Sequence, residues 1–377
     1  MNKIKILHCA DIHIGAAESF LGAFAAKRRI ETLITFEKII DTAAANGVRI
    51  VAIVGDLFNS NDVESSLYEP VFKKIADVPD IKVIFAAGNH DPLNPSSPFF
   101  GRKLPNNLYV LGTKDSCIDF EDIGVRVYGR SFQSVYMCGE KRFTLLPPDD
   151  EKINLMVLHG ELKGDLSSEY NPITSEFIEN SGMDYIALGH IHKRSEIMKL
   201  ANTYYAYSGC AEGQGFDECD EKGVYIGNIG KGICELEFLP ISKRRHIRES
   251  IDITGADTPY NVSELIISTL EKKYGEDFSK NLYRIELIGK AFDETVNNLS
   301  EITARLSDRL YFVKLKDKTE PNYNLEELSN EISLKGLFVK NMLRKIGESE
   351  GEEKETLKYA LNIGIKAFNS EVAFDED

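Results

Sequence analysis

Five of the seven histidines in this 377-residue chain lie in short segments that also carry aspartate, asparagine and glycine. In chain order the segments are Asp11-Ile-His13, Gly55-Asp56, Gly88-Asn-His-Asp91, His159-Gly160 and Gly189-His-Ile-His192. Carboxylate, imidazole and amide-oxygen donors together suit two divalent cations about 3.5–4 Å apart, which clamp a phosphate and activate a water molecule. The residue types therefore indicate the centre of a two-metal phosphoesterase.

Asp56 is the expected bridging ligand, because its two carboxylate oxygens can each take one metal ion. The other expected ligands divide by ion: Asp11, His13 and His192 for one, and Asn89, His159 and His190 for the other. Oxygen ligands favour Mn²⁺ or Mg²⁺, whereas imidazoles favour Mn²⁺, Fe²⁺ or Zn²⁺. Mn²⁺ is therefore the first choice among these ions.

His90 follows the expected ligand Asn89 and precedes Asp91. We expect its imidazole to hydrogen-bond the phosphate and to protonate the leaving oxygen, with Asp91 orienting the ring. A metal-activated water makes a covalent nucleophile unnecessary. Each short motif also occurs by chance in unrelated proteins, so the prediction rests on their joint order at expected strand ends.

The elements that must position these residues follow a layered α/β pattern from residue 4 to about residue 239. Expected strands that end just before or at a ligand-bearing segment cover residues 4–7, 49–54, 82–86, 153–158 and 184–188. Helices are expected over 28–46 and 65–77. Because the carboxyl ends of parallel strands meet at one sheet edge, the ligands are expected to converge there.

The rest of the chain predicts two smaller parts after a first domain of residues 1–240. Residues 241–320 alternate strand and helix patterns, which predicts a small α+β capping domain. Residues 321–377 predict a C-terminal helical region, with apolar residues at helical spacing over 324–346, a Gly- and Glu-rich break over 347–355 and a last helix over 357–368.

Composition limits the classes of protein further. The formal charge of −15 argues against general electrostatic binding of a polyanion. The basic runs 27–29 and 243–248 could be either phosphate contacts or solvated surface. The six cysteines lack Cys-x-x-Cys spacing and are expected to be reduced and mostly buried. His8 is expected in the core and His246 at the surface. No 18-residue apolar run or leader is present, so a cytoplasmic protein without a membrane segment is expected.

The ordered motifs resemble the calcineurin-like metallophosphoesterase superfamily over roughly residues 4–240. The opening Leu7-His-Cys-Ala-Asp-Ile-His-Ile-Gly15, together with segments 55–58, 88–92, 189–193, 207–209 and 215–224, is similar to the SbcD/YhaO-like branch of DNA repair exonucleases. The resemblance implies a four-layer β-sandwich flanked by helices, a smaller α+β capping domain and C-terminal helices. It also implies the same seven metal ligands, and His90 as the transition-state histidine.

The resemblance further implies manganese-dependent 3′-directed exonuclease and endonuclease activity on DNA, and a cap that shapes DNA access. A partner ATPase of the SbcC type would dock on helices after the cap, either 324–346 or 357–368. A homodimer would form through helices near the site, with residues 20–36 and 63–76 as alternatives. A phosphatase or phosphodiesterase acting on a protein, nucleotide or small molecule is the alternative enzyme, and the net charge favours it. A scaffold with a vestigial site is disfavoured by the intact ligand set.

Overall fold

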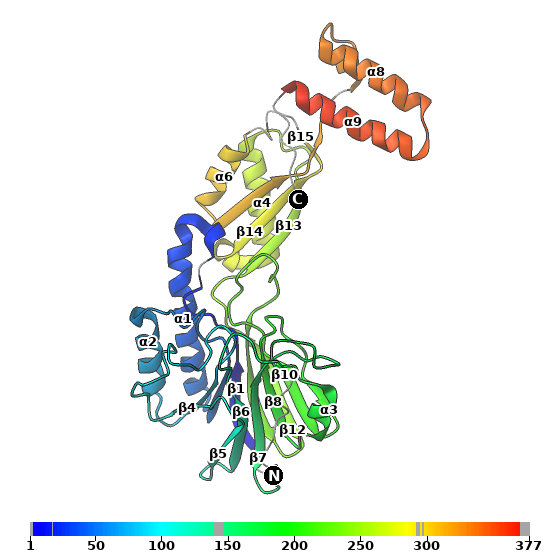
Figure 1. The fold of residues 1–377 in the computed structure, drawn as a ribbon. Helices are drawn as coiled ribbons and strands as arrows, with labels where there is room; N and C mark the ends of the chain where they lie inside the picture. The colour runs from blue at the N-terminus through cyan, green and yellow to red at the C-terminus, as the bar shows by residue number, and fades with distance from the viewer. Residues whose placement is uncertain are drawn as a thin grey trace. The chain divides into compact units, whose positions relative to one another are not determined.

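The computed structural model describes residues 3–16, 18–138, 147–291, 295, 298–323 and 325–369. The chain divides into two compact units, residues 1–245 and 246–377, which we describe separately (Figure 1). The first unit ends close to the boundary expected at residue 240. The further boundary expected at residue 320 stays a prediction.

The first unit contains a six-stranded sheet in the order β12-β11-β1-β2-β3-β4. Its strands are β1 (Lys3–Cys9), β2 (Ile50–Val54), β3 (Lys82–Ala86), β4 (Leu108–Val110), β11 (Gly223–Gly230) and β12 (Ile233–Pro240). Strands β1 to β4 are parallel, and the β11–β12 hairpin adds to β1 antiparallel. A short 3-10 helix, η1 (Ser19–Phe24), and α1 (Ala25–Ala45) join β1 to β2, and α2 (Ser65–Ala76) joins β2 to β3.

A second six-stranded sheet of the same unit has the order β5-β6-β7-β8-β10-β9. Its strands are β5 (Ser116–Phe120), β6 (Val125–Arg130), β7 (Ile153–His159), β8 (Tyr185–Gly189), β9 (Met198–Leu200) and β10 (Thr203–Tyr207). The four central strands are parallel, and the two edge strands are antiparallel to their neighbours. Helix α3 (Ser175–Asn180) lies between β7 and β8 in sequence.

The two sheets pack face to face because their central strands are apolar on both sides. In β2, Val51 and Ile53 join the core that includes Phe36 of α1, whereas Ala52 and Val54 join the core shared with the second sheet. A third apolar cluster joins the outer side of the second sheet to α3. The resulting order of layers is helix, sheet, sheet, helix, and this confirms the predicted architecture.

The second unit contains a three-stranded parallel sheet in the order β13-β14-β16. Its main elements are β13 (His246–Asp252), α4 (Pro259–Tyr274), η2 (Gly275–Lys280), β14 (Leu282–Ile288), α6 (Leu299–Ser307) and β16 (Phe312–Asp317). Helices α4 and α6 pack on one face of the sheet. Two short strands, β15 (Lys290–Ala291) and β17 (Glu320–Pro321), pair with each other.

The C-terminal helices differ from the prediction at two places. The helix expected over 324–346, whose first residue lies outside the described part, is divided into α7 (Leu325–Ser329) and α8 (Leu334–Glu348), because Ser333 begins α8 by accepting the Gly336 N–H. The break expected over 347–355 is present but shorter, because α8 continues to Glu348 and α9 (Gly351–Asn369) follows after residues 349–350. Gly351 has a φ of +60°, which glycine adopts freely, and it makes the turn between the two helices.

The two histidines outside the ligand-bearing segments are both buried, and the cysteines differ in exposure. His8 is fully buried and contacts the Tyr185 hydroxyl, as expected, but His246 is buried and not at the surface. All six cysteines have free thiols, but only Cys9 and Cys210 are buried. Within the described ranges, no helix combines the length and hydropathy needed to cross a membrane.

The basic run 27–29 contains the largest fully buried side chain of the unit, Arg28. Its guanidinium lies 2.7 Å from a Glu18 oxygen, 2.8 Å from a Glu212 oxygen and 3.4 Å from a Glu31 oxygen. Arg28 therefore neutralises buried carboxylates, and the alternative that it contacts phosphate is wrong for this residue.

Arg28→Met is expected to destabilise the first unit by about 3–5 kcal/mol, because it leaves buried carboxylates without their partner. Denaturant unfolding followed by circular dichroism measures the change. Lys27→Met, at the exposed neighbouring position, is the matched control and should change the free energy of unfolding by less than about 0.5 kcal/mol. Equal stability of the two variants would contradict a structural role for the Arg28 cluster.

Candidate metal centre

The seven expected ligands meet at the carboxyl ends of the parallel strands of both sheets. The Asp56 Oδ2 atom lies 3.8 Å from His13 Nε2 and 3.5 Å from His159 Nε2. His13 follows β1 of the first sheet, and His159 ends β7 of the second. Asp56 thus lies between the two sets of donors that the sequence assigns to different ions.

The first set is Asp11, His13 and His192, whose donor atoms lie within 4.8 Å of one another. The Nε2 atoms of His13 and His192 are 3.1 Å apart. The buried Nδ1 atom of His13 has no hydrogen-bond partner among the described residues. Imidazole nitrogens that face each other beside a carboxylate form a donor set that fits a divalent cation.

The second set is joined by the side-chain oxygen of Asn89. This Oδ1 atom lies 3.0 Å from His159 Nε2 and 3.2 Å from His190 Nδ1. His159 is also close to both carboxylates, since donor atoms of Asp11, Asp56 and His159 lie within 4.8 Å of one another. The amide oxygen and two imidazoles therefore give a mixed donor set next to the Asp56 carboxylate, which fits a second cation.

His90 lies at the exposed side of the cluster, with its ring centroid 4.8 Å from that of His13. Its backbone N–H donates to Asp56 Oδ1 over 2.9 Å, and its Nδ1 lies 3.2 Å from the Asn59 carbonyl oxygen. A carbonyl oxygen only accepts, so Nδ1 carries the hydrogen in this contact. The Asn59 carbonyl therefore orients the ring of His90.

Asp91 does not orient the His90 ring, and this corrects the prediction from the sequence. This carboxylate is fully buried and accepts hydrogen bonds from the backbone N–H groups of Asp56, Phe58 and Gly88 over 2.9–3.1 Å. It therefore fixes the loops after β2 and β3 to each other instead of orienting the His90 ring. Burial raises the pKa of Asp91 to about 7.

Glu218 lies near the centre but outside the five ligand-bearing segments of the sequence. Its Oε1 atom lies 2.6 Å from His192 Nδ1, which leaves His192 Nε2 facing His13. Carboxylates that bind the second nitrogen of a metal-ligating histidine fix its tautomer and orientation. Glu218 belongs to the segment 215–224, and the family resemblance of this segment is the one signal in the sequence that points to it.

Two further contacts hold the histidines of the second set. His159 Nδ1 lies 2.9 Å from the Val54 carbonyl oxygen, which directs Nε2 toward Asn89. The ring of Tyr170 stacks on that of His190, with centroids 4.9 Å apart and planes at 29°. Both imidazoles are therefore fixed by groups that are not themselves expected ligands.

The backbone is strained where it carries the expected ligands. Asp11, His13, Asp56 and His190 have φ angles of 49°, 50°, 50° and 98°, and in the described part only two other non-glycine residues have positive φ. Each such conformation costs of order 1–3 kcal/mol and tends to occur at functional sites. The strain is thus concentrated at four of the seven expected ligands.

Glycines next to the ligands allow close backbone approaches. A Cβ atom on Gly189 would lie 1.9 Å from the Val54 carbonyl oxygen, and one on Gly88 would lie 2.1 Å from Asp56 Oδ1. Neither contact is sterically tolerable. The glycines of the motifs therefore bring the loops of the two sheets close enough to share one site.

The cluster combines buried acids with buried imidazoles. Burial raises the pKa of Asp11 to about 6 and lowers that of His13 to about 3. Burial alone would raise the pKa of Asp56, but the neighbouring His159 holds it well below its ordinary value. Burial opposes the charge on His159 as well, yet Asp56 raises its pKa to about 9. A bound dication would neutralise the charge of the same carboxylates, so that His159 would not have to carry a proton.

The comparisons with known proteins agree with this chemistry. A family model described as calcineurin-like phosphoesterase matches residues 4–194, a range that contains every expected ligand and His90. The chain is 25% identical over 353 residues to the uncharacterized metallophosphoesterase YhaO of Bacillus subtilis, covering 87% of this chain and 85% of that protein.

Other similar proteins carry the name DNA double-strand break repair protein Mre11. The one from Aeropyrum pernix is 28% identical over 68% of this chain and 66% of its own length. The one from Methanopyrus kandleri is 22% identical over 67% of this chain and 60% of its own length.

Glu218→Gln is expected to lower the affinity for Mn²⁺ by about 10–100-fold, because it removes the carboxylate that orients His192. Isothermal titration of the full chain with Mn²⁺ measures this affinity directly. Glu221→Gln is the matched control, since Glu221 is an exposed carboxylate in the same loop that pairs with Arg245. If both variants bind Mn²⁺ as the unmodified chain does, Glu218 has no positioning role.

Proposed function

The chain belongs to the calcineurin-like phosphoesterase family of metal-dependent hydrolases, and from this premise we propose that it is a manganese-dependent DNA exonuclease and endonuclease acting in DNA repair. The observation that carries the proposal is the convergence of carboxylate, amide and imidazole donors around Asp56. The similarity to proteins named for DNA double-strand break repair supports DNA as the substrate.

In this proposal Asp56 would be shared by two cations. Asp11, His13 and His192 would hold one ion, and Asn89, His159 and His190 would hold the other. Bound cations would supply a hydroxide nucleophile and offset the charge that develops on the phosphoryl oxygens. Mixed oxygen and imidazole donors support Mn²⁺, with Mg²⁺, Fe²⁺ and Zn²⁺ as alternatives.

His90 is proposed to donate a proton to the leaving oxygen. Because the Asn59 carbonyl takes Nδ1, the other nitrogen, Nε2, is the atom that reaches substrate. The exposure of His90 supports this role, since the expected ligand Asn89 beside it is buried. Asp91 acts as a positioning residue by holding the amides of both adjoining loops.

The proposal includes a coiled-coil ATPase partner of the SbcC type and a cytoplasmic location. The C-terminal helices support a docking role through exposed apolar side chains, among them Leu334 (73% exposed), Leu337 (57%) and Tyr359 (69%). For a homodimer, the exposed Ile30 and Ile34 of α1 favour the segment 20–36, because the apolar side of α2 is buried.

The alternative is a phosphatase or phosphodiesterase acting on a protein, nucleotide or small molecule. The net charge of −15 favours it, because a strongly acidic protein repels a long polyanion more than a small phosphoester. Both functions use the same centre, so the substrate is what an experiment must decide.

His90→Ala is expected to lower the turnover of end-labelled DNA with Mn²⁺ by about 10²–10⁴-fold, because it removes the proton donor. Gel analysis of the products measures the rate, and Mn²⁺ titration should give an unchanged affinity. Ser96→Ala, at an exposed position in the same loop, is the control and should retain full turnover.

A different pattern would favour the alternative function. Hydrolysis of bis-p-nitrophenyl phosphate by the unmodified chain, with no DNA cleavage with or without the ATPase, would contradict the nuclease proposal. If His90→Ala loses both DNA cleavage and hydrolysis of bis-p-nitrophenyl phosphate, then one centre catalyses both reactions.

A further inference from the structure

The glycine of the His159-Gly160 segment is explained by the close approach of Asn171, a residue outside the five ligand-bearing segments. A Cβ atom on Gly160 would lie 2.3 Å from the Asn171 carbonyl oxygen and 2.9 Å from the Asn171 side-chain nitrogen. Both distances are too short for a carbon atom, so a side chain at residue 160 would push Asn171 away. Glycine therefore lets Asn171 lie against the peptide that follows the expected ligand His159.

Asn171 holds the backbone of His159 through its side-chain amide. The amide nitrogen donates to the His159 carbonyl oxygen over 2.8 Å, and the amide oxygen accepts from Arg130 Nη2 over 2.7 Å. A carbonyl only accepts and a guanidinium only donates, so the amide has one possible orientation. Arg130 ends β6 and stands in register with Leu158 of β7. The Asn171 amide therefore links the ends of two neighbouring strands at a residue of the second donor set.

The backbone of Asn171 is strained in the same way as that of the expected ligands. Its φ angle is +48°, and the residue is only 2% exposed. Of the six non-glycine residues with positive φ in the described part of the chain, four are expected ligands, and Asn171 is bonded to a fifth. Asparagine tolerates this conformation better than most residues, but backbone strain is concentrated at functional sites. The strain therefore associates Asn171 with the centre.

A second side chain, Tyr207, holds the next peptide of the same loop. Its hydroxyl donates to the Gly160 carbonyl oxygen over 2.9 Å and accepts from the Leu162 N–H over 2.8 Å. The carbonyl groups of residues 159 and 160 are thus each bonded to a side chain from a different segment of the chain. Because buried carbonyl groups need such partners, Asn171 and Tyr207 together fix the loop that begins at His159.

We propose that Asn171 is a positioning residue for the cation that the second donor set would hold, and that it does not act on the first set. The inference rests on the proposed function for a two-cation centre, but not on DNA as the substrate. Asn171 fixes the backbone of His159, and the Val54 carbonyl fixes its ring. Groups that orient a metal-ligating histidine change metal affinity by about 10–100-fold. Glu218 orients His192 of the first set, so each cation would have its own orienting group.

The test is calorimetric titration of the full chain with Mn²⁺, using two variants of Asn171. Asn171→Asp replaces the donor nitrogen with an oxygen, which cannot donate to the His159 carbonyl. Asn171→Gly removes both side-chain hydrogen bonds and adopts the positive φ freely. Each variant should lower the affinity for one of two Mn²⁺ ions by about 10–100-fold and leave the other affinity unchanged. At limiting Mn²⁺, electron paramagnetic resonance should show single ions in place of a coupled pair.

Asn154→Ala is the matched control, because it removes a buried carboxamide from the opposite end of β7. Asn154 is fully buried and donates to the Asp149 carbonyl oxygen over 2.9 Å. This variant should lose stability but bind both Mn²⁺ ions as the unmodified chain does. Combining Asn171→Gly with Glu218→Gln should weaken both ions, and the two effects should add because the residues act on different ions.

The outcomes separate this inference from the nuclease proposal. Two unchanged Mn²⁺ affinities in the Asn171 variants, equal weakening of both ions, or an equal loss in Asn154→Ala would overturn the inference. An unmodified chain that binds fewer than two Mn²⁺ ions would overturn both the inference and the two-cation centre. If Asn171→Gly weakens one ion as expected but the unmodified chain never cleaves DNA, the nuclease proposal alone fails.

Discussion

The Asp56 carboxylate must lie where the strands of both sheets end. Asp56 Oδ2 is within 4 Å of an imidazole from each sheet, so the two sheets must end at the same place for the cluster to exist. The apolar core between the sheets provides this, since residues of β2 and β7 pack against each other there. The hydrogen bond between His159 and the Val54 carbonyl continues that contact to the edge of the cluster.

Forming the cluster costs free energy of folding locally, and the packing of the rest of the unit offsets this cost. Left-handed backbone at Asp11, His13 and Asp56 opposes folding, and so does the burial of the two carboxylates. Fully buried strands on either side over-determine these conformations, and the Asp91 carboxylate fixes two of the loops through their amides. Strain of this kind keeps donor atoms in place before a cation arrives, so less ordering is needed on binding.

The strands could be predicted from the sequence, and so could the place where the expected ligand residues meet, because both follow from local pattern. Apolar β-branched runs that end at Asp, Asn or His need only the general rule for parallel strands. The role of Asp91 was mispredicted because its position next to His90 in the sequence suggested a contact with that ring. Its carboxylate instead accepts hydrogen bonds from backbone N–H groups of two different loops. Glu218 was missed because it lies 26 positions from His192 along the chain, and no periodicity links the two residues.

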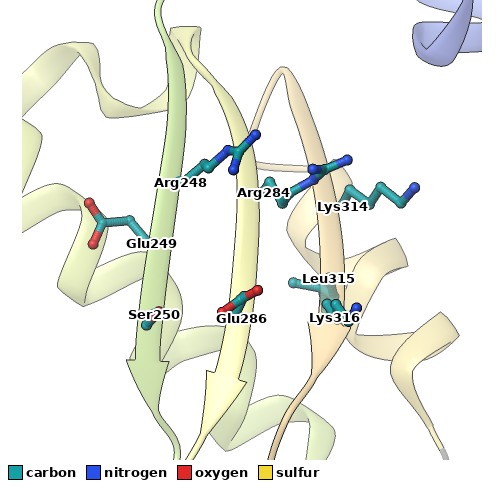
Figure 2. Close-up of a pocket in the computed structure, with 8 residues that line it drawn as sticks. All are labelled: Arg248, Glu249, Ser250, Arg284, Glu286, Lys314, Leu315 and Lys316. Atoms are coloured by element: carbon teal, nitrogen blue, oxygen red, sulfur yellow. The ribbon is translucent and has the colours of Figure 1, made fainter. Parts of the chain in front are cut away.

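Net charge is a poor guide to what this chain can bind. A total of −15 argued against a polyanion, yet screening limits each surface charge to a range of about 8–10 Å at physiological salt. Arg248, Arg284 and Lys314 stand in register on three neighbouring strands (Figure 2), which places their backbones within that range of one another. The buried acids of the first unit are also donors that cations would neutralise. The distribution of charge, rather than its sum, therefore decides whether a polyanionic substrate is compatible with this fold.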